Sequence, residues 1–298
     1  MTALADRPGR AMPPAVPERD EALTGALVPV AVQRWRGGGL APEVDWAAEE
    51  VAVSLEYNGI GHAVMMATPD ALEDLGLGFS LSEGIAAGAH EVLDLEVHAH
   101  PAGLRIAMQI TAQRFMALKL RRRSLAGRTG CGLCGVDSLE QSVRPLAPLA
   151  GGRTAPALDM GRLAAAMTGL EQAQPLRALS GATHAAAWLG PDGALHAVRE
   201  DVGRHNALDK TIGALLRAGV DAGQGAALLT SRASVEMVQK AVAAGIPVLV
   251  ARSAPTALAV RRAQALGLTL VGFARRDGCL VYAHAWRLQP RQDSGGRS

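Results

Sequence analysis

The sequence predicts an α/β protein with two subdomains. One observation indicates the fold class, and two indicate the division of the chain. Over residues 226–285, short apolar runs alternate with helix-like segments, the βαβαβ order typical of a parallel sheet covered by helices. The chain has 298 residues, enough for one large or two modest domains. A stretch rich in proline and glycine, residues 145–156, predicts a linker in the middle. We therefore expect a disordered tail over 1–28, an N-terminal subdomain over 29–150, a C-terminal subdomain over 151–289 and a second tail over 290–298.

The N-terminal subdomain should combine a hairpin with helices. Asn58-Gly59 between two apolar runs is a strong hairpin signal, and Pro69-Asp70 is typical of the start of a helix. The expected elements are strands at 51–56 and 60–67, a helix after 70, strands at 92–98 and 104–111, and a helix over 112–125.

The C-terminal subdomain begins with a helix and a second hairpin. Pro191-Asp192-Gly193 predicts the turn of that hairpin. The expected elements are a helix over 161–171, strands at 183–189 and 194–199, a helix over 204–217, then strands at 226–230, 247–251, 268–273 and 279–285 separated by helices over 233–244 and 255–266.

Composition excludes several classes of function. Aromatic residues make up only 3% of the chain and the net charge is +2, which argues against both an aromatic platform for single-stranded nucleic acid and a polycationic duplex binder. No apolar run approaches the roughly 20 residues of a membrane span, and the first 28 residues lack the apolar core of a signal peptide. Three cysteines do not form a secreted disulfide framework. We expect a cytoplasmic protein without nucleic-acid or membrane partners.

Two of the three cysteines, Cys131 and Cys134, lie in a glycine-rich run directly after the basic segment 121–123. Nearby cationic groups lower the pKa of a thiol and so favour the reactive thiolate. A thioredoxin-type redox pair should lie between a strand and a helix, and a structural zinc site needs four ligands, so both interpretations are weak here. The run also matches Gly-x-Gly-x-x-Gly, but it follows a helix-like segment instead of a strand. The pattern favours a sulfur-handling or nucleophilic pair, with no bound metal.

The loops after the three parallel strands are rich in hydroxyls and arginines. Ligands of open α/β sheets bind at the carboxyl ends of the strands, where helix N-termini offer free N–H groups to anions. The alternative is that the hydroxyls only cap the helices. The candidate residues are Ser231, Arg232, Ser253, Thr256, Arg275 and Arg276.

The segment 199–210 concentrates charge in a strand-to-helix turn. Its polar residues could form part of a site or could simply cap the helix, and the sequence leaves both interpretations open. His205 lies one helical turn before Asp209 and faces the same side. The third cysteine, Cys279, lies in an apolar strand and is more typical of a core residue.

Several segments together resemble the FdhD/NarQ family. They are the cysteine run 128–135, Ser180-Gly-Ala-Thr-His184, the segment 199–210, residues 68–75, 78–79 and 83–84, Leu229-Thr-Ser-Arg-Ala-Ser-Val-Glu-Met-Val, and Gly272-Phe-Ala-Arg. They occur in the family's order from about residue 51 to 284. The resemblance implies a fold similar to that of cytidine deaminases but without zinc, and a homodimer.

The resemblance also implies a function. Members of this family are sulfur carriers required for formate dehydrogenase activity: a sulfurtransferase accepts persulfide sulfur from a cysteine desulfurase and passes it to molybdenum cofactor, as the bis(molybdopterin guanine dinucleotide), before that cofactor enters formate dehydrogenase. Cys131 then corresponds to the persulfide carrier and Cys134 to a supporting residue. The implied cofactor-binding residues are Phe273, Ala274, Arg275, Arg276, Asp277 and Gly278, with His184 and His205 as further candidates. The alternative is a chaperone that holds the cofactor without covalent sulfur chemistry.

Overall fold

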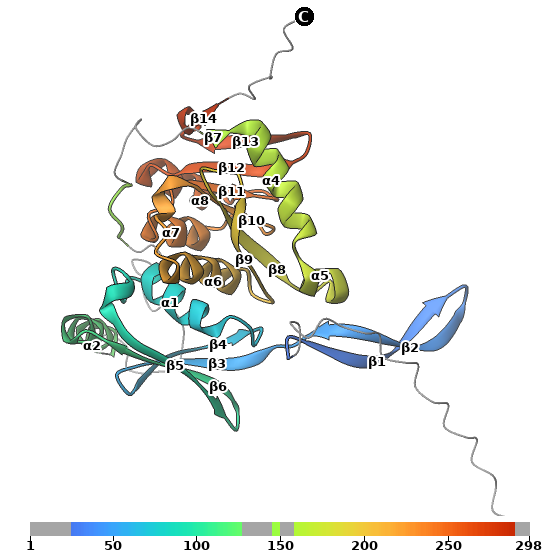
Figure 1. Ribbon diagram of the computed structural model, residues 1–298, viewed down its shortest axis with the longest axis horizontal. Helices are drawn as coiled ribbons and strands as arrows, with labels where there is room; N and C mark the ends of the chain where they lie inside the picture. The colour runs from blue at the N-terminus through green and yellow to red at the C-terminus, as the bar shows by residue number, and fades with distance from the viewer. Residues whose placement is uncertain (1–24, 127–144, 150–157, 290–298) are drawn as a thin grey trace, which may run out of the picture.

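The structure is a computed structural model that describes residues 25–126, 145–149 and 158–289. It confirms the mixed α/β class. The described residues form a four-stranded sheet in the N-terminal part and a six-stranded sheet in the C-terminal part, together with two pairs of short or isolated strands (Figure 1). No helix in this part of the chain is long and apolar enough to cross a membrane.

The four-stranded sheet carries the predicted hairpin. β3 (Val51–Tyr57) and β4 (Ile60–Ala67) are antiparallel, and β6 (Gly103–Ile110) lies between β3 and β5 (Val92–His100) in the order β4-β3-β6-β5. Alternate residues of β3 and β6 point to one face, which α1 (Leu72–Ser82) covers. The core of this part contains Leu55, Leu75 and Met108, each with none of its surface exposed. The helix α2 (Ala112–Ala126) ends the N-terminal part.

The six-stranded sheet contains the predicted parallel strands. β10 (Ala226–Leu229), β11 (Val248–Ala251) and β12 (Thr269–Arg275) run parallel, which confirms the βαβαβ prediction. The hairpin of β8 (His184–Leu189) and β9 (Leu195–Asp201) joins β10 antiparallel, and β13 (Gly278–Ala283) joins β12 antiparallel, giving the order β13-β12-β11-β10-β8-β9. The sheet is therefore mixed.

Helices cover both faces of this sheet, so its central strands are buried along their whole length. α6 (Arg204–Arg217), α7 (Val235–Ala243) and α8 (Ala257–Leu266) pack on one face, and α4 (Met160–Gln172) packs on the other (Figure 1). The remaining elements are α5 (Pro175–Ser180), the strand pair β7 (Leu158–Asp159) with β14 (Leu288–Gln289), and 3-10 turns at Ala89–Glu91, Ala222–Gln224 and Ala285–Arg287.

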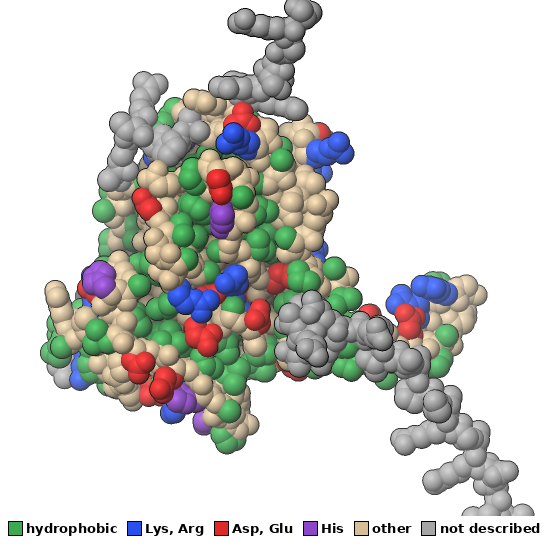
Figure 2. All heavy atoms as spheres, viewed as in Figure 1, with side chains coloured by type: hydrophobic (Ala, Val, Ile, Leu, Met, Phe, Trp, Pro, Cys, Tyr) green, Lys and Arg blue, Asp and Glu red, His purple; other side chains and the backbone are tan. Residues whose placement is uncertain are grey.

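The two parts meet where α1 crosses α6. The helices approach so closely that a Cβ atom on Gly78 would lie 1.7 Å from the carbonyl oxygen of Asp209. Asp74 of α1, fully buried, forms ion pairs with Arg199 and Arg217 of the C-terminal part at 2.7 and 3.0 Å. Figure 2 shows acidic and basic side chains interspersed along this seam. The seam positions α1 against the middle and end of α6 and against β9.

The structure differs from the sequence-based expectation at three places. A two-stranded ribbon of β1 (Leu27–Arg36) and β2 (Gly39–Ala48) was not expected, and it begins two residues inside the predicted tail of 1–28. The short helix α5 was also not expected; Glu200 of β9 accepts the N–H groups of Leu176 and Arg177 at its first turn. Leu149, placed in the N-terminal subdomain, instead packs on the C-terminal core and donates its N–H to the Leu266 carbonyl over 2.9 Å.

Candidate functional site

The three predicted loops lie side by side at the carboxyl edge of the parallel strands. Ala233 and Pro255 form a parallel β-bridge, and the Thr256 N–H donates to the carbonyl of Ala233 over 3.1 Å. The Phe273 N–H donates to the carbonyl of Ser253 over 3.3 Å. These contacts place the ends of β10, β11 and β12 next to each other, as the sheet topology predicts. We refer to this region as the carboxyl edge.

Three helices begin at the carboxyl edge: α7 and α8, which follow parallel strands, and also α6. β9 ends beside the start of β8, because Asp201 pairs with His184, and α6 begins directly afterwards. The N-cap residues are Gly203 for α6, Ser234 for α7 and Thr256 for α8. Only Thr256 caps its helix, accepting the Ala259 N–H over 3.2 Å. The N-cap side chains of α6 and α7 do not cap their helices. At α7 the Glu236 carboxylate accepts the Glu236 N–H, and the other N–H groups of the two first turns can bind an anion.

The serines in these loops fit the two interpretations differently. The Ser231 side chain is buried and donates to the neighbouring carbonyl of Arg232 over 3.1 Å, so its hydroxyl already has a local partner. Ser253 is half-buried, and its carbonyl accepts the Phe273 N–H. The capping interpretation therefore holds for Thr256 and not for the two serines.

Arginines supply positive charge at this edge. Arg232, Arg275 and Arg276 are exposed. Arg252 forms an ion pair with Glu171, yet its Nη1 atom is buried without a hydrogen-bond partner among the described residues. The Nε atom of Arg204, the first residue of α6, is likewise buried without a partner in that part of the chain. Buried N–H donors left unsatisfied are costly, and an anion at the edge would satisfy them.

The sequence did not single out Arg204. Arg204 directly precedes His205 in the sequence, but its position near His184 arises only when β8 and α6 come together, so no local motif signals it.

His184 and His205 both lie at the carboxyl edge. Burial lowers the pKa of His184, and Arg177 and Arg204 lower it further. Burial also lowers the pKa of His205, to about 4, with Arg204 and Lys240 adding to the effect. Both imidazoles are therefore neutral at pH 7 and can accept a hydrogen bond or a proton.

The segment Phe273–Gly278 forms the hairpin between β12 and β13. Phe273 has a φ of 52° and its side chain is 40% exposed. The following Ala274 is buried in the core on the α4 side, so its side chain is not available to a ligand. Arg275 pairs with Gly278, and Arg276 and Asp277 form the exposed turn. Within this hairpin, the side chains available to a ligand are therefore those of Phe273 and the three turn-proximal charged residues.

Cys131 and Cys134 lie outside the described residues. The helix that precedes them, α2, is attached to the end of α1: Arg121 donates to the carbonyl oxygens of Glu83 and Gly84 over 3.2 and 3.3 Å. The third cysteine, Cys279, is half-buried against the core, and burial raises the pKa of its thiol. Cys279 therefore fits the core role that the sequence indicated.

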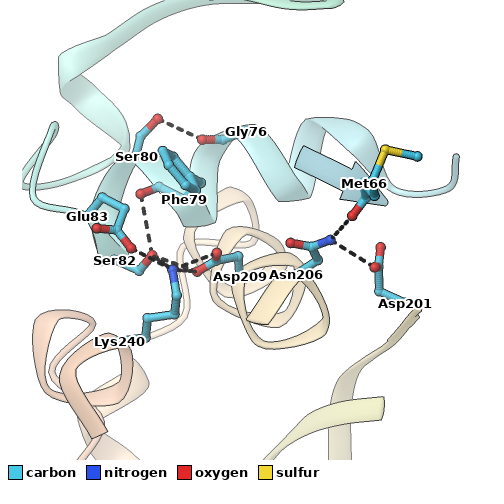
Figure 3. Close-up of polar contacts among 10 residues, drawn as sticks. All are labelled: Met66, Gly76, Phe79, Ser80, Ser82, Glu83, Asp201, Asn206, Asp209 and Lys240. Atoms are coloured by element: carbon cyan, nitrogen blue, oxygen red, sulfur yellow. Dashed lines mark hydrogen bonds and ion pairs between the residues drawn. The ribbon is translucent and has the colours of Figure 1, made fainter. Parts of the chain in front are cut away.

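The sequence left open whether the segment 199–210 has a functional or a structural role. For one of its carboxylates, Asp201, the structure supports a structural role. Asp201 is fully buried and forms an ion pair with Lys210 at 2.7 Å. It also accepts the N–H groups of Thr68 and Gly203. The side-chain amide of Asn206 donates to Asp201 as well (Figure 3). These contacts join the end of β4 to the start of α6, so Asp201 holds the two parts of the molecule together.

Lys240 and Asp209 form a second buried ion pair, shown in Figure 3. Lys240 Nζ lies 2.8 Å from Asp209 Oδ2 and 2.8 Å from Glu83 Oε1, and Ser82 donates to Asp209 over 2.6 Å. Burial lowers the pKa of Lys240, but the two carboxylates outweigh it and the net shift is upward. Burial raises the pKa of Asp209, and the Lys240 ammonium group, which lowers it, offsets only part of this shift. Because Asp209 accepts hydrogen bonds from both Lys240 and Ser82, we assign it as a carboxylate paired with a protonated Lys240.

The described residues contain no group of three or more His, Cys, Asp or Glu side chains arranged to hold a metal ion. The predicted absence of zinc at the cysteine pair concerns residues outside this part and stays a prediction.

Comparison with known proteins decides the family. The model of the FdhD/NarQ family matches residues 48–289. The chain belongs to the FdhD/NarQ family. It is 55% identical over 259 residues to a protein of Cupriavidus necator named "Sulfur carrier protein FdhD", covering 87% of this chain and 89% of the relative. A protein of the same name from Variovorax paradoxus is 52% identical over 244 residues, covering 82% and 87% of the two chains.

A solved structure supports the fold assignment. The crystal structure of a "putative formate dehydrogenase accessory protein" from Desulfotalea psychrophila superposes with a TM-score of 0.70 at 25% identity. It covers 89% of this chain and all of that one. The mixed α/β architecture is therefore shared with this solved structure.

Proposed function

We propose that this chain is a sulfur carrier in the maturation of formate dehydrogenase. The names of the relatives, at more than half identity over most of both chains, support a role in carrying sulfur. The observation that carries the ligand part of the proposal is the carboxyl edge, which holds the N-termini of α6 and α7, neither capped by its N-cap side chain, and the unsatisfied N–H donors of Arg204 and Arg252. Such an arrangement suits a ligand with phosphate groups.

In the first step, the Cys131 thiolate attacks the outer sulfur of a persulfide on a cysteine desulfurase. The new S–S bond forms on Cys131, the S–S bond of the desulfurase breaks, and the desulfurase cysteine leaves as a thiolate. No oxidant is consumed, because the sulfane sulfur moves with its oxidation state unchanged. Cys134 supports this step as a neighbouring thiol.

In the second step, the outer sulfur passes to the molybdenum cofactor, bis(molybdopterin guanine dinucleotide), which is the substrate. The S–S bond of the Cys131 persulfide breaks, Cys131 leaves as a thiolate, and the reduced molybdenum of the substrate supplies the two electrons that convert the sulfane sulfur to sulfide. We propose that the carboxyl edge holds this dinucleotide: the starts of α6 and α7 and the arginines bind phosphate oxygens, Phe273 offers an exposed ring to a base, and the neutral His184 and His205 accept hydrogen bonds. A likeness to cytidine deaminases and a homodimeric state also remain proposals.

The second candidate function is a chaperone that binds the cofactor without covalent sulfur chemistry. The same carboxyl edge favours it, because ligand binding there needs neither cysteine. The two candidates differ in whether Cys131 carries sulfur.

Intact-mass measurement separates them. After incubation with a cysteine desulfurase and cysteine, the wild type and the Cys279→Ala control should gain one sulfur that a thiol reductant removes. The Cys131→Ala variant should gain none. Labile sulfur on Cys131→Ala would contradict the assignment of the carrier residue, and no gain on the wild type would favour the chaperone.

A further inference from the structure

The side chain of Arg121 joins α2 to the end of α1. Its two terminal nitrogens, Nη1 and Nη2, donate to the carbonyl oxygens of Glu83 and Gly84 over 3.2 and 3.3 Å. Glu83 is the C-cap residue of α1, so both carbonyls lie just past the last turn, at the negative end of the helix dipole. A planar guanidinium donates to two acceptors at once, so this contact fixes an orientation as well as a distance.

Core packing holds the first half of α2. Leu118 is buried in the core of the N-terminal part, whereas Leu120 is 60% exposed. Arg121 is the last residue of α2 whose side chain the structure describes. It is therefore the described anchor nearest in sequence to Cys131, which follows it by ten positions.

The end of α1 is also tied to the helices that begin at the carboxyl edge. The Glu83 carboxylate lies 2.8 Å from Lys240 Nζ of α7, and the same ammonium lies 2.8 Å from Asp209 Oδ2 of α6 (Figure 3). The charges of Glu83 and Lys240 both act on the pKa of His205, so the end of α1 lies near that imidazole. Arg121 thus attaches α2 to the unit that carries the carboxyl edge.

We propose that Arg121 is a positioning residue for sulfur transfer: by holding α2 against the end of α1, it keeps the cysteine run 128–135 within reach of the carboxyl edge. This inference rests on the proposed function, in which the second step moves sulfur from Cys131 to a ligand at that edge. The sequence associates the basic segment 121–123 with a lowered pKa of the thiol. In the structure the Arg121 guanidinium is bound to carbonyl groups of α1, which favours an anchoring role over an electrostatic one.

Chain length determines how far from this anchor the thiol can lie. Cys131 follows the last residue of α2, Ala126, by five positions, and five extended residues span at most about 18 Å. The helix between residues 121 and 126 adds roughly 7.5 Å. With Arg121 bound, the thiol stays within about 25 Å of a point fixed on the body of the molecule. Without that bond the end of α2 can move away from α1, and the local concentration of the thiol at the carboxyl edge falls.

Spin-label distances test the anchor without sulfur chemistry. One label is placed on Cys131 and the other on Arg261→Cys, an exposed position of α8, in a full-length chain that also carries Cys134→Ser and Cys279→Ala. Double electron–electron resonance then measures the distribution of distances between the two labels.

Two substitutions that each remove one positive charge from α2 are compared in this labelled chain. Arg121→Gln removes the contact with α1 and should broaden the distribution of distances. Lys119→Gln is the matched control, because the Lys119 ammonium lies 4.3 Å from the centre of the Phe115 ring of the same helix, and it should leave the distribution unchanged. Circular dichroism should be the same for both variants. Equal distributions for Arg121→Gln and the control would overturn the proposal.

Sulfur-transfer rates separate anchoring from charge. In chains with all three cysteines, loaded by a cysteine desulfurase and cysteine, Arg121→Gln should take up one sulfur as the wild type does. Its single-turnover transfer to bis(molybdopterin guanine dinucleotide) should be about ten-fold slower, whereas Lys119→Gln should keep the wild-type rate. Arg121→Lys keeps the charge but lacks the planar fork, so it should recover only part of the rate.

Full recovery by Arg121→Lys, or a wild-type rate for Arg121→Gln, would refute the positioning role. A wild type that takes up no sulfur would instead contradict the proposed function itself. Normal uptake with equal rates of the second step would contradict only the role of Arg121, so the two failures are distinguishable.

Discussion

Gly78 of α1 and Gly213 of α6 make reciprocal backbone contacts where the two helices cross. A Cβ atom on Gly78 would lie 1.7 Å from the Asp209 carbonyl oxygen, and one on Gly213 would lie 1.8 Å from the Asp74 carbonyl oxygen. Both neighbours are helix backbone and cannot rotate away. The crossing of α1 and α6 therefore exists only because these two positions lack side chains.

The Gly78→Ala substitution should destabilise the protein by about 3 kcal/mol, because the helices must separate to admit a methyl group. Urea denaturation should show this as a lower midpoint with a similar slope. The control is Gly61→Ala in β4, where a Cβ would meet nothing within 4 Å. Equal midpoints for the two variants would contradict the close approach of the helices.

The Lys240→Met substitution should cost about 3–5 kcal/mol of unfolding free energy, because it leaves the buried Asp209 carboxylate without its cation. Adding Asp209→Asn to this variant should recover part of the loss. The matched control, Lys119→Met, removes a charge that lies over the Phe115 ring and should change stability by only about 1 kcal/mol or less. If the double variant is less stable than Lys240→Met alone, the unpaired Asp209 carboxylate is not the cause of the lost stability.

The stability of the protein should fall as the pH is lowered from about 6.5 toward about 4, in part because of His205. The folded-state pKa of His205 is about 4, below the value of about 6.5 expected in the unfolded chain. Between these values the unfolded state binds more protons, so stability rises with pH. Unfolding free energies at pH 5 and 7.5 should therefore differ less for His205→Gln than for the wild type. An identical difference in both proteins would show that His205 is not buried as described.

Arg204 should contribute to nucleotide binding at the carboxyl edge. A charge-assisted hydrogen bond contributes about 1.5–3 kcal/mol, so Arg204→Ala, and separately the pair Arg275→Ala with Arg276→Ala, should weaken GDP binding about ten-fold or more. Arg261→Ala, an exposed arginine within α8, is the control and should bind as the wild type does. Titration calorimetry measures all four proteins. Equal affinity for Arg204→Ala and the control would remove Arg204 from the binding surface.

The strands and helices that sequence reasoning placed correctly have strong local signals. The runs that became β10 and β11 are apolar throughout because helices cover both sheet faces, and Asn58-Gly59 marked the turn of β3 and β4. The ribbon of β1 and β2 was not predicted because Pro29 and Pro42 are unusual in strands. Such prolines are tolerated where a strand has a free edge, as both strands of a lone ribbon do.

The candidate site was predictable only in part. The three loops at the carboxyl edge followed from topology, whereas the third helix N-terminus required knowing that β9 ends beside β8. The carboxylates of 199–210 gave an ambiguous signal because buried and exposed charges look alike in sequence. Asp201 became structural through contacts with Thr68, more than a hundred residues earlier in the chain.

At position 273, stability favours glycine, whereas ligand binding favours the phenylalanine that is present. A residue with a side chain held at a φ of 52° carries strain of about 1 kcal/mol or more that glycine avoids. Phe273→Gly should therefore raise the thermal midpoint slightly, while the loss of the exposed ring should weaken nucleotide binding. Selection of variants for heat resistance alone would tend to replace this residue. The resulting proteins would be more stable but would bind the nucleotide less tightly.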